Sequence, residues 1–159
     1  MRTHMHREIS ALKKRMITLG ASVEKSVEFS FQALKNMDSK AAEIVLEQDQ
    51  KINEEEVLIE EEILKILALY QPVATDLRTL VAMLKMNNDL ERMGDLACNV
   101  AVYSKKIAAM GTVDIPEQFE KMYQVVLEMT RDMIDCFLDS DIDKALAVCK
   151  ADEHVDECH

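Results

Sequence analysis

The scarcity of turn-forming residues constrains this chain more than any other feature of its sequence. Among 159 residues there are only three glycines and two prolines. A strand-rich fold needs a turn every dozen residues or so, and glycine and proline supply most of these turns. The low aromatic content, 4%, together with 31% charged residues is instead typical of long helices. The sequence therefore predicts an all-α fold.

The few capping and breaking residues divide the chain into five predicted helices. Asp38 or Ser39 can cap a helix N-terminus, Pro72 suits a first helical turn, and Gly111 suits a helix C-terminus. Pro116 and Asp141 mark the beginnings of two further predicted helices. Because the connections are short, long helices of this kind predict an antiparallel up-down bundle. The predicted helices cover residues 4–36, 39–70 and 73–110, a fourth segment that starts at 116, and 141–159.

Apolar residues in the second predicted helix recur at the spacing of a single buried face. The steps between them are seven, seven, four, three and four residues, which keeps them on one side of a helix. This face consists of Val45, Ile52, Ile59, Ile63, Ile66 and Tyr70.

The charge balance excludes several classes of partner. The net charge is −11, from 30 acidic and 19 basic residues, and such a surface repels nucleic acids and anionic membranes. No apolar run approaches the ~18 residues that span a bilayer, and the N-terminus lacks a signal-peptide stretch. The four cysteines form no paired motif. We therefore expect a soluble cytoplasmic protein with no direct membrane insertion.

A weak internal repeat relates the two ends of the chain. A shift of 103 positions places Asp49 on Asp152 and Asn53 on Asp156, and it also superimposes the predicted caps Asp38 and Asp141. The repeat predicts a duplication whose second copy is cut short, because no partner for the third helix follows. The expected domains are a three-helix repeat, residues 1–111, and a partial second repeat, residues 112–159.

The third predicted helix carries two carboxylates inside an apolar stripe. At about 100° per residue, Glu91 and Asp95 fall in the middle of this stripe. Burying both without partners would cost several kcal/mol, so basic residues, water or a cation must compensate. The alternative is that Glu91 and Asp95 simply form ion pairs with basic side chains. This alternative is weakened because Arg92 and Lys85 point away from the two carboxylates. The stripe consists of Leu77, Leu80, Leu84, Cys98 and Val102.

The turn near residue 71 places a second polar pair opposite the first. Asp49 and Asn53 precede this turn by about as many residues as Glu91 and Asp95 follow it, so the two pairs should lie at one height of the hairpin. Carboxylate and amide oxygens suit hard or borderline cations, namely Fe, Mn, Mg or, less well, Zn. Near the C-terminus, Asp152 and Asp156 repeat the spacing, although this segment could equally be a frayed helix end.

Three segments resemble the PhoU family of phosphate-signalling regulators: residues 71–78, residues 89–95 and residues 49–53. The resemblance implies two three-helix repeats, each with a Glu/Asp-x-x-x-Asp motif, which in some members holds iron or zinc clusters and in others magnesium or manganese. Glu91 and Asp95 match this motif, and Asp49 matches the upstream acidic position. At the second position of this upstream motif, Asn53 stands where the family has an acidic residue. The implied metal ligands are Asp49, Asn53, Glu91, Asp95, Asp152 and Asp156.

The resemblance also implies a function. Members are expected to restrain phosphate uptake as cytoplasmic adaptors without enzymatic activity. Their expected partners are the ATPase subunit of the phosphate ABC transporter and a sensor histidine kinase. High phosphate then silences the phosphate-starvation genes.

Two other classes of function compete with this expectation. A carboxylate-bridged di-metal enzyme normally uses Glu-x-x-His ligands, and no Glu here has a His three residues later. A purely structural helical bundle is the third possibility.

The apolar faces of the fourth and fifth helices also lack a covering helix, which predicts either a homodimer or folding back onto the first three helices.

Overall fold

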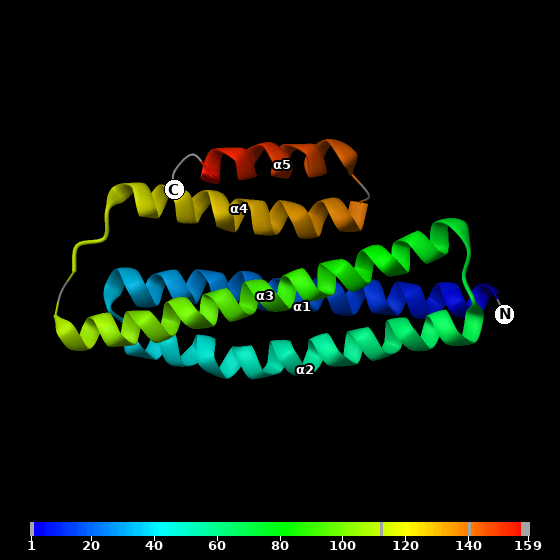
Figure 1. The fold of residues 1–159 in the computed structure, drawn as a ribbon, viewed down its shortest axis with the longest axis horizontal. Helices are drawn as coiled ribbons and strands as arrows, with labels where there is room; N and C mark the ends of the chain where they lie inside the picture. Colours follow the sequence, from blue (N-terminus) through cyan, green and yellow to red (C-terminus); the bar gives the residue numbers. More distant parts are fainter. Residues whose placement is uncertain (1, 112, 140, 157–159) are drawn as a thin grey trace.

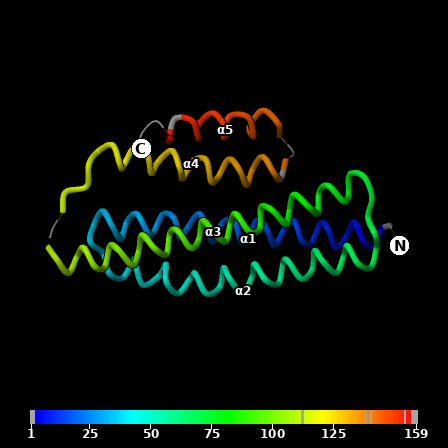
Figure 2. Tube along the Cα trace, in the orientation of Figure 1, coloured from blue at the N-terminus to red at the C-terminus, as the bar shows by residue number. Residues whose placement is uncertain are grey.

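Five antiparallel helices make up the computed structural model, which describes residues 2–111, 113–139 and 141–156. Successive helices run in opposite directions, as the colours of Figure 2 show, so the predicted all-α up-down bundle is confirmed. The end of the predicted fifth helix, residues 157–159, lies outside the described residues. None of the described helices is long and apolar enough to cross a membrane. The helices are α1 (Arg2–Asn36), α2 (Ser39–Tyr70), α3 (Ala74–Met110), α4 (Glu117–Asp139) and α5 (Ile142–Asp156).

Two aspartates cap helices as predicted. Asp38 Oδ1 accepts hydrogen bonds from the backbone N–H groups of Lys40 and Ala41, at 2.9 and 3.2 Å, at the start of α2. Asp141 Oδ1 accepts one from the N–H of Lys144, at 3.0 Å, at the start of α5. Both carboxylates satisfy backbone donors that have no partner within the helix.

The connection between α2 and α3 differs from the predicted one. Val73 is the N-cap of α3, so Pro72 precedes the helix rather than occupying its first turn. Gln71 adopts a left-handed conformation, with φ 46°, while its N–H donates to the carbonyl of Leu67 at 3.2 Å. Proline disfavours α conformation in the residue before it, and α2 ends at Tyr70 as predicted. Helix α3 begins at Ala74, one residue later than predicted, so the link is one residue longer.

Helices α1, α2 and α3 pack against one another around a common core. The predicted face of α2 is confirmed, since Val45, Ile52, Ile59, Ile63 and Ile66 are all at most 1% exposed. Tyr70 is half-buried at the end of this face, and its hydroxyl donates to Glu8 Oε1 of α1 at 3.0 Å. The three helices thus form a complete bundle by themselves.

Helix α4 folds back onto α1, and α5 lies on the outer side of α4 (Figure 1). The buried residues of α4 are Tyr123, Leu127, Thr130 and Ile134, each at most 9% exposed. Tyr123 stacks on Phe31 of α1 with ring centroids 3.8 Å apart. Among the described helices, α5 packs its backbone closely against α4 alone. Folding back is therefore the arrangement adopted within one chain.

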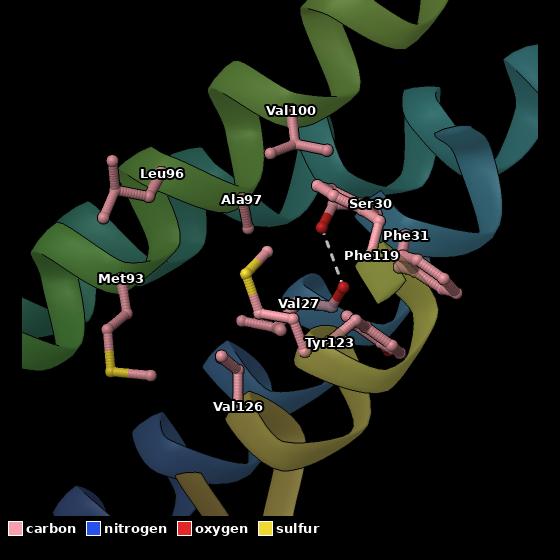
Figure 3. A pocket seen from close by; sticks show the side chains of 11 residues that line it. Val27, Ser30, Phe31, Met93, Leu96, Ala97, Val100, Phe119, Tyr123 and Val126 are labelled. Atoms are coloured by element: carbon pink, nitrogen blue, oxygen red, sulfur yellow. Dashed lines mark hydrogen bonds between the residues drawn. The ribbon is translucent and has the colours of Figure 1, made fainter. Parts of the chain in front are cut away.

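An apolar groove of about 200 Å³ lies where α4 diverges from α3 above α1 (Figure 3). Met93, Leu96 and Val100 line its α3 side, while Phe119 and Met122 line its α4 side. Phe119 and Met122 are only half-buried because a neighbouring face of α4 docks on α1. The groove is thus the apolar surface that folding back leaves uncovered.

Candidate metal centre

A polar seam runs between α2 and α3, and it draws on the same spacing in both helices. Each helix contributes residues at positions i, i+4 and i+7, which lie within about 60° of one another on a helix surface. Because α2 and α3 are antiparallel, the two sets face one another in reverse order. The seam consists of Asp49, Asn53 and Glu56 from α2, and of Glu91, Asp95 and Cys98 from α3.

The predicted position of the carboxylates in the middle of the buried stripe is wrong. Glu91 is half-buried and Asp95 is exposed, whereas Leu77 of the predicted stripe is 40% exposed. Small residues decide this orientation of α3: an added Cβ at Gly94 would lie 3.3 Å from Ile52 Cγ2, so the helices approach closely there. The carboxylates border the buried face, which consists of Leu80, Met83, Asn87, Leu90, Gly94, Ala97, Ala101 and Ser104.

The carboxylates of the seam interact electrostatically. Burial raises the pKa of Asp49, and the charge of Asp95 raises it further, while a hydrogen bond with the Cys98 thiol works in the opposite direction. Burial also raises the pKa of Glu91, followed by the charges of Asp95 and Asp49. Asp95 therefore lies near enough to Asp49 and to Glu91 for its negative charge to raise the pKa of both.

Three buried oxygen atoms, two in the seam and one beside it, lack a hydrogen-bond donor among the described residues. They are the Oδ1 atoms of Asp49, Asn53 and Asn87. Asn87 is fully buried, and its Nδ2 donates across the seam to the carbonyl of Glu56 at 2.9 Å and to Glu56 Oε1 at 3.3 Å. Buried polar atoms normally have partners, so three acceptors without donors in and beside one seam indicate a missing positive charge or donor.

Basic side chains do not neutralise the seam within the described part of the chain. The ion pairs nearest in sequence involve other acids: Arg15 pairs with Glu55 at 2.8 Å, and Lys105 pairs with Glu43 at 3.3 Å. In the described residues, no three His, Cys, Asp or Glu side chains converge tightly enough to hold a metal ion in this conformation. Carboxylate and amide oxygens are nevertheless the donor types that hard cations prefer, so the chemistry of these residues, but not their spacing in this structure, fits a cation.

The second predicted pair lies apart from the seam. Asp152 and Asp156 are exposed on α5, which packs against α4 and not against α2 or α3 among the described elements. No described helix faces them in the way that α3 faces Asp49. Their role as metal ligands stays a prediction.

Cys98 is the seam residue that sequence reasoning missed. The apolar stripe assigned it to the core, but it is half-buried and lies near the Asp49 carboxylate. Burial raises the pKa of the Cys98 thiol, and the charges of Asp49 and Asp95 add to the effect. Its position three residues after Asp95 was the signal that places it on the same helix face.

Comparison with known proteins places the chain in a family. The PhoU domain matches residues 16–103 and 119–159. The chain is 31% identical to the phosphate-specific transport system accessory protein PhoU homolog of Clostridium acetobutylicum, covering 96% of this chain and 70% of that protein. It is 30% identical to the PhoU accessory protein of Escherichia coli, covering 94% of this chain and 62% of that protein.

Solved structures show the same backbone arrangement. The crystal structure of PhoU from Pseudomonas aeruginosa superimposes with a TM-score of 0.91 at 34% identity, over 96% of this chain and 74% of that one. The phosphate transport system regulatory protein PhoU from Streptococcus pneumoniae gives 0.86 at 28% identity, over 97% and 72%. The acidic seam, the helical order and these matches lead to one conclusion: this chain belongs to the PhoU family.

Proposed function

We propose that this protein is a negative regulator of phosphate uptake and of phosphate-starvation signalling. The observation that carries the proposal is the agreement of sequence and backbone with PhoU proteins over at least 94% of the chain. The relatives are accessory proteins of phosphate-specific transport systems, and a regulatory role follows from that name. The chain spans 62–70% of the length of these relatives. The proposed regulatory role is therefore assigned to the segment that this chain shares with them.

The proposed mode of action is that of a cytoplasmic adaptor without turnover. Its partners are the ATPase subunit of the phosphate ABC transporter and the associated sensor histidine kinase. All four histidines lie at the two ends of the sequence, at positions 4, 6, 154 and 159, far in sequence from Glu91 and Asp95. The seam therefore lacks the imidazole ligands of di-metal helical-bundle enzymes, which supports binding rather than catalysis.

The seam gives the adaptor a metal site. We propose that Asp49, Asn53, Glu91 and Asp95 hold an Fe, Zn, Mg or Mn ion. A divalent cation there would offset the repulsion among three carboxylates and hold α2 against α3. The metal would thus set the rigidity of the bundle that presents its surface to partners.

A deletion strain tests the regulatory role. Loss of the gene should raise expression of phosphate-starvation genes in phosphate-rich medium, and a plasmid copy of the chain should restore silencing. Unchanged expression in a strain with no redundant copy would count decisively against the role.

A binding experiment tests the adaptor mode. The purified chain should co-elute with the transporter ATPase subunit of the same organism in size-exclusion chromatography. The triple variant Asp49→Asn, Glu91→Gln, Asp95→Asn should bind more weakly, while a matched triple variant of exposed acids, Glu54→Gln, Glu61→Gln, Asp89→Asn, should not. Failure of the unmodified chain to bind either the ATPase or the sensor kinase would exclude the adaptor mode.

A further inference from the structure

We propose that the outer face of the α2–α3 pair docks a basic amphipathic helix of the partner protein. This inference rests on the adaptor mode proposed above and not on the metal site. It concerns the surface that the partner meets and the chemistry of the segment that makes the contact. The outer α2–α3 face comprises the seam and, nearer the α2–α3 turn, Glu60, Leu64, Leu67, Leu77, Val81 and Leu84.

No described helix covers this face. Among the described elements, α2 and α3 make close backbone contacts only with each other and with α1, while α4 packs on α1. Met93 of α3 lines the groove next to α4. Glu91 and Asp95 are each two positions away from Met93, which places them about 160° round the helix from it. The outer α2–α3 face therefore lies on the flank of α3 that is turned away from α4.

The end of the outer α2–α3 face nearer the turn is apolar. Leu64, Leu77 and Val81 are 50%, 40% and 41% exposed. Counted from the hydrogen bond between Asn87 and Glu56, Val81 lies six residues toward the turn on α3, and Leu64 lies eight residues toward it on α2. These offsets are about 9 and 12 Å along the helices, so the two side chains lie at nearly the same height. Exposed apolar side chains gathered in this way are typical of a protein-binding surface.

The rest of the outer α2–α3 face is acidic and lacks positive charges. None of the ion pairs among the described residues includes Asp49, Glu56 or Glu91. Burial raises the pKa of Glu56, and the charges of Glu60 and Glu91 raise it further. The side chain of Asn87, fully buried beside Glu56, has an Oδ1 atom without a donor among the described residues. This end of the face therefore offers negative charge and acceptor oxygens to a segment that brings donors.

Charge determines what can occupy the outer α2–α3 face. Arginine and lysine side chains carry N–H donors and no acceptor, so they complement acceptor oxygens that lack donors. A second copy of this chain would bring a net charge of −11 to a face that is already acidic. Nucleic acids and anionic membranes would be repelled in the same way. The occupant is therefore a basic segment of a different protein.

The spacing of the residues indicates that this segment is a helix. Leu77, Leu84 and Glu91 recur at intervals of seven along α3, and Glu60 and Leu67 do so along α2. Rows with this spacing on two neighbouring helices form the surface on which a further helix packs. The row on α3 is about 21 Å long, so a partner helix of about 14 residues covers it. Its apolar side chains lie against the end nearer the turn, and its basic side chains lie against the carboxylates.

Two lysine substitutions at positions of similar exposure test the location of the contact. Val81→Lys places a positive charge on the outer α2–α3 face. Leu58→Lys places the same charge at a position that is 48% exposed, about 160° round α2 from Glu56. Each full chain is titrated by calorimetry with the transporter ATPase subunit or with the sensor kinase, whichever co-elutes with the unmodified chain. We expect Val81→Lys to weaken binding roughly tenfold or more and Leu58→Lys to change it less than about twofold.

Salt and chelator distinguish a basic helix from a bridging metal ion. The affinity of the unmodified chain should fall roughly tenfold between about 50 and about 500 mM NaCl, and it should be unchanged by EDTA. The double variant Glu56→Gln, Glu91→Gln should bind more weakly and depend less on salt. The control Glu54→Gln, Glu61→Gln, which alters two exposed acids of α2, should behave as the unmodified chain does.

The outcomes separate this inference from the adaptor mode itself. Equal binding by Val81→Lys and Leu58→Lys would overturn the outer α2–α3 face as the docking surface and leave the adaptor mode standing. Loss of binding in EDTA would overturn direct contact with a basic segment. Absence of binding by the unmodified chain to both proteins would overturn both proposals. Circular dichroism of each variant checks that the helices are intact, and Leu77→Lys serves if Val81→Lys fails to fold.

Discussion

At the scale of single residues, the seam is a place where the fold tolerates unfavourable charge. The side chains of Asp49 and Glu91 both have raised pKa values because they are partly buried and lie near other acids. A carboxyl group whose pKa is raised on folding binds protons more tightly in the folded state than in the unfolded one. Its ionisation therefore destabilises the fold as pH rises.

The substitution Asp49→Asn tests this electrostatic cost. Below the ordinary pKa of an aspartate, about 3.9, the Asp49 carboxyl group is protonated in both states and costs nothing. As pH rises through the raised folded pKa, stability is lost, so at pH 7 and in the presence of chelator the variant should melt about 1–3 °C higher than the unmodified protein. The difference should shrink toward zero near pH 4 in thermal melts followed by circular dichroism.

Added metal should reverse the order of stability of the unmodified protein and Asp49→Asn. With saturating Zn²⁺ the unmodified protein gains stability by binding, and Asp49→Asn loses part of that gain. Asp89→Asn, an exposed acid on α3, should show neither effect. A variant at position 49 that is less stable than the unmodified protein in chelator at pH 7 would contradict the electrostatic account.

At the scale of secondary-structure elements, the least secure part of the fold is the attachment of the α4–α5 hairpin. Only α1 approaches α4 closely among the first three helices, through Phe31 stacked on Tyr123 and through two ion pairs, Lys35 with Glu120 and Glu24 with Arg131. Surface ion pairs contribute little, so apolar contacts carry most of the attachment.

Helix α4 comes close to α1 at Gly20. A Cβ at this position would lie 2.7 Å from Ile134 Cδ1 and 2.9 Å from its Cγ1. The substitution Gly20→Leu should therefore push α4 off α1, and hydrogen exchange should show lost protection in residues 117–139 while α2 and α3 stay protected. Ala11→Leu, at an exposed position on the same helix, controls for the change in side chain. Unchanged protection of α4 in Gly20→Leu would show that the hairpin is held by other contacts.

At the scale of the whole molecule, folding back leaves apolar surface uncovered. The groove between α3 and α4 is lined almost wholly by apolar side chains, and Leu96 at its edge is 57% exposed. Each large apolar side chain left in water forgoes about 1.5–3 kcal/mol of burial free energy. A patch of this kind favours association with a second surface, and we propose that a second copy of the chain covers it.

Sedimentation velocity tests the proposed homodimer. The unmodified protein should sediment as a dimer at micromolar concentration, and Leu96→Glu should raise the fraction of monomer by placing a charge in the groove. Val57→Glu, at a residue of α2 that is 50% exposed and outside the groove, should leave the distribution unchanged. Equal effects of the two variants, or a monomeric unmodified protein, would rule out this surface as the interface.

Short-range rules predicted much of this protein from sequence. The breaks at Asp38, Gly111 and Asp141 and the apolar periodicity of α2 depend only on residues within one or two helical turns. The order and approximate bounds of the helices therefore follow without knowledge of the packing. The equal offsets of Asp49 and Glu91 from the α2–α3 turn likewise predicted that they lie at one level.

Only the tertiary structure decided which helix faces meet. The residues Gly94, Ala97 and Ala101 carry little hydrophobic weight in a sequence pattern, yet their small size lets α3 approach α2 and turns Glu91 and Asp95 to the edge of the core. The same packing buries Asn87 and sets the Cys98 thiol against Asp49. The physical reason is that a helix with several partly apolar faces buries the one that packs most closely against its neighbours, and that choice depends on residues far away in the sequence.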